Sequence, residues 1–136
     1  MYMLDTNICI YILKKHPPEI QTKFNQIDSI HISTIVYSEL CYGIELSPYH
    51  LQIPRQKQLD EFISLLKIHT WDEKSASIYA KIRAYLKKKG TPIGNMDMLI
   101  AAHALSLNAI LVTNNTREFS RVPELKFENW TIPSPI

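Results

Sequence analysis

Cysteine and long apolar runs are scarce in this sequence, and each scarcity argues against a class of protein. The 136 residues contain two cysteines, Cys9 and Cys41, with no CxxC pair and no cysteine–histidine cluster, which argues against a disulfide framework and a structural zinc site. The longest weakly polar stretch, 99–112, is shorter than the roughly 20 apolar residues of a membrane span. The first residues lack the basic and apolar regions of a secretory signal, so we expect a cytoplasmic protein without membrane contact.

No charge of one sign dominates, and no repeat divides the chain. The formal net charge is +2, which permits a nucleic-acid partner without indicating one. Hydrophobic residues make up 46% and charged residues 21%, which excludes disordered, collagen-like and coiled-coil chains. The three glycines are scattered and no linker is evident, so we expect a single domain over residues 1–136.

Apolar patterns and capping residues predict strands that alternate with helices. Strands are expected at 1–4, 29–32, 67–69, 109–113 and 126–130. Helices are expected from about residue 8 to 13, from Pro18 onward, and at 34–46, 55–66, 72–89 and 95–107. This alternation implies an α/β fold in which a central parallel β-sheet is flanked by helices on both faces.

Three acidic residues occupy positions where a surface carboxylate is not expected. Asp5 follows the first strand, at the edge where parallel sheets bind ligands, although it could also simply cap the next helix. Glu39 shares a helical stripe with Val36 and Leu40, so it lies among core-facing positions. Asp97 lies near the start of an apolar helix, either as a core-facing carboxylate or as a first-turn acid favoured by the helix dipole.

A carboxylate rarely enters a core unless it is paired or binds a metal, because desolvation costs several kcal/mol per ion. No lysine or arginine lies on the stripes of Glu39 and Asp97. If the three acids converge, their repulsion raises their pKa values unless a cation neutralises them, and oxygen ligands favour Mg²⁺ or Mn²⁺. The pattern therefore predicts a divalent-metal site, onto which Asn114 and Asn115, after a later strand, would also open.

Four segments of the sequence resemble the successive signature segments of the PIN-domain family, specifically its VapC-type toxins. They read MLDTNI at 3–8, YSELCYG at 37–43, IGNMDMLIAAHA at 93–104 and LVTNNTREF at 111–119. The resemblance extends to 122–123 and 128–130 and so covers nearly the whole chain. It implies a PIN fold and a metal-dependent ribonuclease that leaves 5′-phosphate and 3′-hydroxyl ends.

The same resemblance implies the site residues and the cofactor. Asp5, Glu39 and Asp97 match the family's acidic positions, with Asp5 and Asp97 as direct Mg²⁺ ligands (Mn²⁺ as the alternative) and Glu39 as a ligand or water-positioning residue. The family's fourth acidic position falls on Asn115, which can coordinate or hydrogen-bond but carries no charge, so one metal ion and two both stay open. Glu118, about one helical turn on, could substitute for that acid.

The resemblance also implies partners and a substrate. VapC-type proteins form homodimers and bind a VapB-type antitoxin whose C-terminal segment blocks the acidic site. Operator DNA is expected only through the antitoxin complex. The implied function is the toxin of a type II toxin–antitoxin module that cleaves RNA, with the anticodon loop of initiator tRNA as the favoured target, and so inhibits translation.

Two other functions stay open at this stage. A non-catalytic PIN-like module could act with its antitoxin in operator DNA binding and autoregulation, with Asn115 as the mark of a decayed site, although Asp5, Glu39 and Asp97 are intact. A phosphotransfer domain also carries an acid after its first strand. However, Asn7 stands where the haloacid-dehalogenase-like motif has a second aspartate, and a receiver's phosphoacceptor is not evident.

Basic and aromatic residues outside the acidic set allow two interpretations. Lys81, Arg83 and the run 87–89 could track RNA phosphates, or could form a solvated face and stabilise a helix end. Arg117, next to the fourth acidic position, is the better candidate for a phosphate contact. His103 is expected to be a hydrogen-bonded core histidine. Four tyrosines stay open between base stacking and core packing: Tyr11, Tyr37, Tyr42 and Tyr49.

Overall fold

The computed structural model describes residues 1–131, in which five strands form one parallel sheet. The strands are β1 (Tyr2–Leu4), β2 (Ile30–Ser33), β3 (Lys67–His69), β4 (Ile110–Val112) and β5 (Phe127–Glu128). They lie in the order β3-β2-β1-β4-β5, and every neighbouring pair is parallel. Leu4 pairs with Val112, so the residues that follow β1 and β4 emerge side by side at the carboxyl edge of the sheet.

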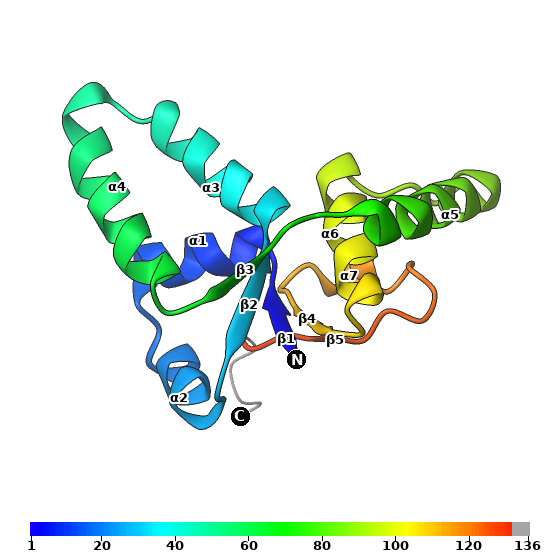
Figure 1. Ribbon diagram of the computed structural model, residues 1–136, viewed down its shortest axis with the longest axis horizontal. Coiled ribbons are helices and arrows are strands. Elements are labelled where there is room, and N and C mark those ends of the chain that lie inside the picture. The colour runs from blue at the N-terminus through cyan, green and yellow to red at the C-terminus, as the bar shows by residue number, and fades with distance from the viewer. Residues whose placement is uncertain (132–136) are drawn as a thin grey trace.

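Helices cover both faces of this sheet, as the alternating pattern predicted (Figure 1). They are α1 (Thr6–Lys15), α2 (Pro18–Gln26), α3 (Thr34–Glu45), α4 (Tyr49–Ile63), α5 (Glu73–Lys89), α6 (Asn95–Ser106) and α7 (Thr116–Phe119). Two helix pairs, α3 with α4 and α5 with α6, diverge from the carboxyl edge of the sheet. Among the described residues, no helix is both long enough and apolar enough to cross a membrane.

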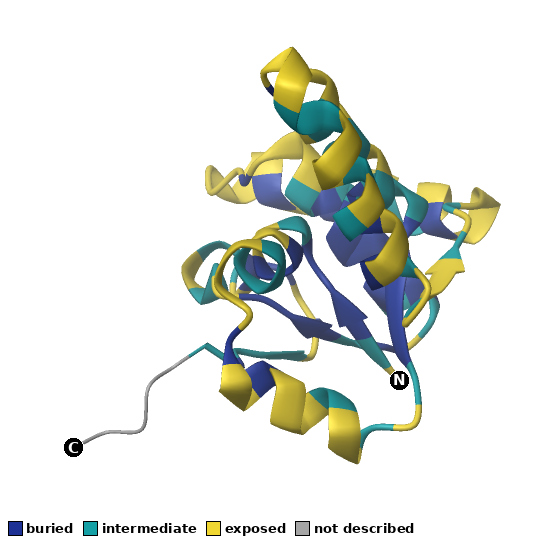
Figure 2. Ribbon diagram, turned by 90° about the vertical axis from the view of Figure 1, so that its left-hand side faces the viewer, coloured by how far each residue is buried: buried dark blue, intermediate teal, exposed yellow. Residues whose placement is uncertain are grey.

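The hydrophobic core runs from the strands into α6. Met3, Leu4 and Leu111 in the sheet are fully buried, and so are Ile100 and Ala101 in α6. Alanines also occupy two further buried positions of this helix, and their small side chains let neighbouring elements approach it closely. Figure 2 shows the result, with buried strands inside and exposed residues on the outer faces of the helices. Asp97 is therefore carried by a helix that is anchored in the core.

Local capping fixes where several helices begin and end. The Asp5 carboxylate accepts a hydrogen bond from the Ile8 backbone N–H at 2.9 Å, and the Ser33 hydroxyl caps α3 in the same way. Asp72 caps α5, which ends at Gly90 in the left-handed conformation with φ of 71°. These boundaries match the predicted ones closely.

One local prediction was wrong, and one helix was not predicted. The helix expected from residue 55 begins at Tyr49 and ends at Ile63, and Pro54 lies inside it. Proline cannot donate a hydrogen bond to the carbonyl of His50, but His50 is exposed, so water can satisfy this group. The short helix α7 was not predicted at all, because four residues are too few to show an apolar period.

Candidate active site

The three acidic residues singled out in the sequence come from three different elements and meet at the carboxyl edge of the sheet. Asp5 follows β1, Glu39 lies on α3 and Asp97 lies in the first turn of α6. The negative charge of Glu39 raises the pKa of Asp5, and the charges of Asp5 and Glu39 both raise the pKa of Asp97. The three carboxyl groups therefore act on one another and form one acidic cluster, defined here as Asp5, Glu39 and Asp97.

Asp5 is the most buried member of the acidic cluster, with 1% of its surface exposed. Burial raises its pKa to about 6, although the Thr113 hydroxyl and the Ile8 backbone N–H both stabilise the charged form. Its own backbone N–H donates to the Val112 carbonyl at 3.0 Å, which fixes the residue between β1 and β4. Asp5 is thus both a helix cap and a buried carboxyl group, so the two interpretations of its sequence position do not exclude each other.

Glu39 is half-buried and is held by a residue next to Asp5. The Thr6 hydroxyl donates a hydrogen bond to Glu39 Oε1, which ties the first turn of α1 to α3. A carboxylate oxygen accepts more than one hydrogen bond, so this contact leaves acceptor capacity for a ligand or water. Thr6 therefore orients Glu39 within the acidic cluster.

Asp97 is bridged to a fourth carboxylate by Asn115. The Asn115 side-chain amide donates to Asp97 Oδ2 at 3.4 Å and to Glu118 Oε2 at 3.1 Å. Both partners are acceptors, so the amide NH₂ must face them, and the opposite orientation would set three oxygens against one another. Asn115 therefore acts here as a hydrogen-bond donor between two carboxylates, and Glu118 lies close enough to complete an acidic group around it.

The electrostatics of Asp97 show what the acidic cluster lacks. Its pKa is raised to about 7, first by burial and then by the contact with Glu118 and the charges of Asp5, Glu118 and Glu39. Within the described residues 1–131, the charged groups that raise the pKa of Asp97 are all carboxylates. An ionised cluster of this kind needs a cation, and carboxylate oxygens are the ligands that hard divalent cations prefer.

The donor set fits a hydrated divalent cation better than a closed protein cage. Within the described part of the chain, no three His, Cys, Asp or Glu side chains are arranged to hold a metal ion by themselves. Mg²⁺ usually keeps several waters and needs only one or two carboxylates together with substrate phosphates. Gly94 lies beside this carboxylate, and a Cβ there would come to 3.5 Å from Asp97 Oδ2, an ordinary contact distance.

Other residues discussed from the sequence lie around this site or away from it. Asn114 and Arg117 are exposed beside Asn115, and the buried Thr113 hydroxyl accepts the Asn115 backbone N–H at 2.9 Å. His103 is 1% exposed and shares a 2.7 Å hydrogen bond with a serine hydroxyl, which confirms it as a core histidine.

Two aromatic residues next to α6, Trp71 and Tyr79, were not predicted from the sequence as neighbours of the site. The Tyr79 hydroxyl donates to Asn95 Oδ1 at 2.6 Å, two residues before Asp97. Trp71 lies beside Tyr79, with ring centroids 6.1 Å apart. The i, i+4 spacing of Tyr79 and Arg83 on one helix was the available signal, but it does not indicate which neighbouring helix they contact.

Sequence comparison identifies a family and a group within it. The PIN domain family model matches residues 2–125. The chain is 45% identical to Ribonuclease VapC2 of Rickettsia felis, over 96% of this chain and 98% of that protein. It is 44% identical to the tRNA(fMet)-specific endonuclease VapC of Salmonella typhimurium, over 95% of this chain and 97% of that protein.

Solved structures agree with the sequence relatives. One is the crystal structure of VapBC2 from Rickettsia felis bound to a DNA fragment from their promoter, with a TM-score of 0.90 and 44% identity over 95% of this chain and 98% of that one. Another is DNA-bound VapBC from Salmonella typhimurium, with a TM-score of 0.91 and 41% identity over 95% and 97%. Together with the PIN-domain match, these similarities show that the chain belongs to the PIN-domain family and, within it, to the VapC ribonucleases.

Proposed function

We propose that this protein is the toxin of a VapBC-type toxin–antitoxin module and an Mg²⁺-dependent endoribonuclease, which cleaves the anticodon loop of initiator tRNA in the cytoplasm and so inhibits translation. The observation that carries the proposal is the acidic cluster at the sheet edge, where the charge of Glu39 raises the pKa of Asp5 and the charges of Asp5 and Glu39 raise the pKa of Asp97. The substrate is proposed from the relative in Salmonella typhimurium that is named a tRNA(fMet)-specific endonuclease. A single-stranded loop suits a recessed site because its backbone can be splayed out.

In this proposal, Asp5 and Asp97 hold the cation and Glu39 orients the attacking water. Asp5 is held in place by the Ile8 N–H and the Thr113 hydroxyl, and Asp97 by α6 and the Asn115 amide. When bound, Mg²⁺ lowers the pKa of water at the site and stabilises charge on the phosphate oxygens. Glu39, which accepts the Thr6 hydroxyl through Oε1, has acceptor capacity left to align that water for in-line attack.

Asn115 contributes to the proposed site through its neighbours. Because its amide donates to both Asp97 and Glu118, it keeps two like-charged groups close together without adding a charge. Glu118 supplies the carboxylate that the fourth acidic position lacks. We therefore assign Asn115 the role of positioning Asp97, and leave Glu118 as the group that would assist a second cation.

The proposed protein partner is a VapB-type antitoxin, with operator DNA reached through the complex and a homodimer of this chain as the basic unit. Supporting structures are the related VapBC assemblies, two of them bound to DNA. A cavity of about 290 Å³ between α1, α3 and α4 has walls that include Ile10, Leu13 and Leu40, and Glu39 also lines it. An apolar segment with an arginine that reaches Glu39 would fit this cavity and could block the site, since a guanidinium pairs well with a carboxylate.

The test is end-mapped cleavage of total RNA by the purified, antitoxin-free protein with Mg²⁺ or Mn²⁺. A single metal-dependent cut in the anticodon loop of initiator tRNA, absent with a chelator and in Asp5→Asn, is the expected result. Asparagine can still cap α1, so the variant should stay folded. If a folded protein with verified metal binding cleaves no RNA, the proposal is overturned. A non-catalytic partner of the antitoxin is then favoured.

A further inference from the structure

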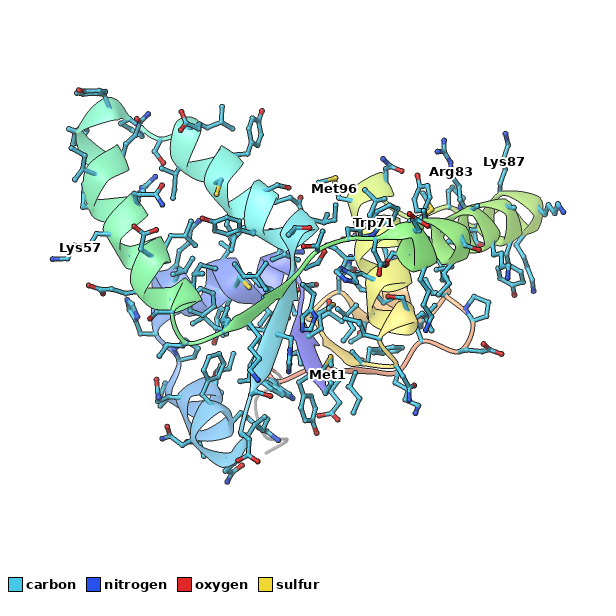
Figure 3. All side chains as sticks on the ribbon, viewed as in Figure 1. Met1, Lys57, Trp71, Arg83, Lys87 and Met96 are labelled. Atoms are coloured by element: carbon cyan, nitrogen blue, oxygen red, sulfur yellow. The ribbon has the colours of Figure 1, made fainter. Side chains whose placement is uncertain are left out.

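Outside the acidic cluster, Trp71 lies just before α5, and Tyr79, Arg83 and Lys87 follow on that helix at intervals of four residues. Trp71 and Tyr79 meet edge to face, with an interplanar angle of 77°. The Arg83 guanidinium lies over the Tyr79 ring, 6.0 Å from its centroid. Lys87 lies one turn further on, and Figure 3 shows Arg83 and Lys87 projecting from the same side of the helix. We call Trp71, Tyr79, Arg83 and Lys87 the α5 ridge.

The ridge begins between the two helices that carry Glu39 and Asp97. The Trp71 backbone N–H donates to Thr34 Oγ1 at 3.2 Å, in the first turn of α3. Its indole Nε1 donates to the Leu99 carbonyl of α6 at 2.9 Å. Trp71 is half-buried, so the residue is not fully covered by the protein. A strand bound at the acidic cluster would therefore meet an aromatic ring as it leaves between α3 and α6.

The next two members of the ridge are fixed in place by uncharged partners. The Tyr79 hydroxyl donates to Asn95 Oδ1 at 2.6 Å and accepts a hydrogen bond from Arg83 Nη1 at 3.1 Å. Neither partner of the Arg83 guanidinium here, the hydroxyl or the ring, carries a charge. Arg83 is exposed, and a guanidinium has five N–H donors, so both its charge and most of its donors stay available. This is a preorganised cation whose charge these contacts leave uncompensated.

Aromatic rings followed by spaced cations match the chemistry of single-stranded RNA. Bases stack on aromatic rings whatever their sequence, and cations in a groove follow the phosphates. Arg83 and Lys87 are four residues apart, which is about 6 Å along the helix axis and comparable to the spacing of consecutive phosphates in an RNA strand. A merely solvated helix face would not need the ordered Tyr79 network beneath its arginine.

We propose that the α5 ridge binds the single-stranded RNA that flanks the scissile phosphate, with bases on Trp71 and Tyr79 and two successive phosphates on Arg83 and Lys87. This inference rests on the proposed RNA-cleaving function and adds the path that the substrate takes to the site. It assigns α5 a role in substrate binding and leaves bond cleavage to the acidic cluster.

The ridge is tested by binding, without cleavage or metal. The probe is a fluorescently labelled anticodon stem-loop of initiator tRNA, titrated against Asp97→Asn protein in EDTA, so that both the missing carboxylate and the removal of metal suppress cleavage. We expect Arg83→Gln and Lys87→Gln each to weaken binding about five- to tenfold and to reduce the slope of log K against log salt by about 0.7, one phosphate contact on a single strand. Tyr79→Ala should weaken binding about tenfold through lost stacking.

Lys57→Gln is the matched control, because Lys57 is an exposed lysine on α4, on the other helix pair, and its removal changes the net charge equally (Figure 3). It should leave both affinity and salt slope unchanged. Arg83→Lys retains the charge but loses the planar group that stacks on Tyr79, so it should fall between wild type and Arg83→Gln. Arg83 and Lys87 are exposed, and their variants should unfold at the wild-type temperature.

The outcomes separate this inference from the proposed function. If the wild-type protein cleaves RNA while the ridge variants bind like the Lys57→Gln control, the ridge is overturned and the nuclease stands. If the ridge variants lose RNA binding but the wild type cleaves no RNA, the ridge stands and the nuclease fails. If sedimentation shows that Arg83→Gln changes the oligomeric state and that this accounts for the lost binding, the ridge is a contact between copies and the inference is overturned.

Discussion

The acidic cluster and a second group of three titratable side chains, His31, His69 and His103, lie on neighbouring elements, yet they satisfy their polar atoms in opposite ways. His31 Nδ1 and His69 Nε2 share a 2.7 Å hydrogen bond, and His31 Nε2 pairs with the Ser29 hydroxyl at 3.0 Å. His103 Nδ1 pairs with Ser33 at 2.7 Å, and its ring lies edge-on to that of His69. We call these three residues the histidine cluster.

The difference follows from the hydrogen-bonding capacity of the two side chains. A neutral imidazole has one donor and one acceptor, so two histidines can satisfy each other, whereas two ionised carboxylates are both acceptors and cannot. Burial lowers the pKa values of His31 and His103, and the proximity of His69 lowers them further, which favours the neutral rings. Burial of Asp5 and Asp97 instead raises pKa values without supplying a counter-charge. We therefore interpret buried titratable groups that satisfy one another's hydrogen bonds as structural. Buried groups of like charge that cannot do so mark a site for an external ligand.

The largest expected effect is on cleavage by Asp97→Asn. Loss of this carboxylate should reduce the rate about 10²–10³-fold, as expected when a group that stabilises the transition state is removed. The metal-free variant should nevertheless unfold at the same or a higher temperature than the wild type, because one of the repelling charges is gone. Single-turnover cleavage and thermal unfolding in EDTA check the two parts. A variant that loses stability together with activity would contradict the ligand-site interpretation.

The opposite pattern is expected for His103→Ala. This change removes a buried ring and leaves the Ser33 hydroxyl without its partner, which should cost about 2–4 kcal/mol of unfolding free energy. Cleavage per folded molecule should stay within about threefold of wild type, because His103 is not part of the acidic cluster and effects at separate sites are usually independent. Urea denaturation and active-fraction-corrected rates measure this. If the variant lost cleavage at unchanged stability, the histidine cluster would have to be counted as functional.

The pH dependence of metal-free stability should separate the two clusters further. The pKa of Asp97 is raised to about 7, so the folded state binds its proton more tightly than the unfolded state, and this contribution to stability is lost as pH rises toward 7. The pKa values of His31 and His103 are lowered in the folded state, so the unfolded state binds their protons more tightly. Their contribution to stability is therefore lost as pH falls below the ordinary value of 6.5.

Asp97→Asn isolates the acidic part of this dependence. The stability gained by the variant relative to wild type should be near zero at pH 4, grow through pH 5–7 and reach a plateau above pH 7. Urea denaturation in EDTA across this range checks it, with His103→Ala as the comparison at acid pH. A difference that is constant with pH would mean that the Asp97 carboxyl group is not perturbed in the folded protein.

Much of the fold could be predicted because its signals are local. Asp5, Ser33, Asp72 and Gly90 mark helix ends through bonds to residues two to four positions away, and short apolar runs mark the strands. The parallel sheet then follows from alternation alone. The meeting of Asp5, Glu39 and Asp97 was also expected, because Asp5 follows a strand at the carboxyl edge while Glu39 and Asp97 are carboxylates on core-facing helix positions. Their catalytic roles stay predictions.

The rest depends on contacts between distant residues. His31, His69 and His103 are separated by more than 30 positions from one another, and nothing in their local sequence indicates that they pair. Pro54 normally breaks a helix, and α4 tolerates it because the exposed His50 carbonyl can bond water instead. That exposure depends on the tertiary fold and not on the local sequence. The bridging role of the Asn115 amide likewise depends on α7, a helix too short to be predicted.

The smallest expected effect concerns Asn115→Asp, which makes the acidic cluster still less like the histidine cluster. The change replaces the amide that donates to Asp97 and Glu118 with a further acceptor, so the pKa of Asp97 should rise beyond about 7. Metal-free protein at pH 8 should lose about 1 kcal/mol, and Mg²⁺ should restore it, because saturation at ten times the dissociation constant contributes about 1.4 kcal/mol. Calorimetric titration should show tighter Mg²⁺ binding, by about threefold to tenfold, since one more carboxylate joins the donor set.

Asn115→Ala is the matched control, because it removes the same amide without adding a charge and should lose metal-free stability without gaining Mg²⁺ affinity. Equal affinity in the two variants would show that position 115 acts on Asp97 alone and lies outside the reach of the cation.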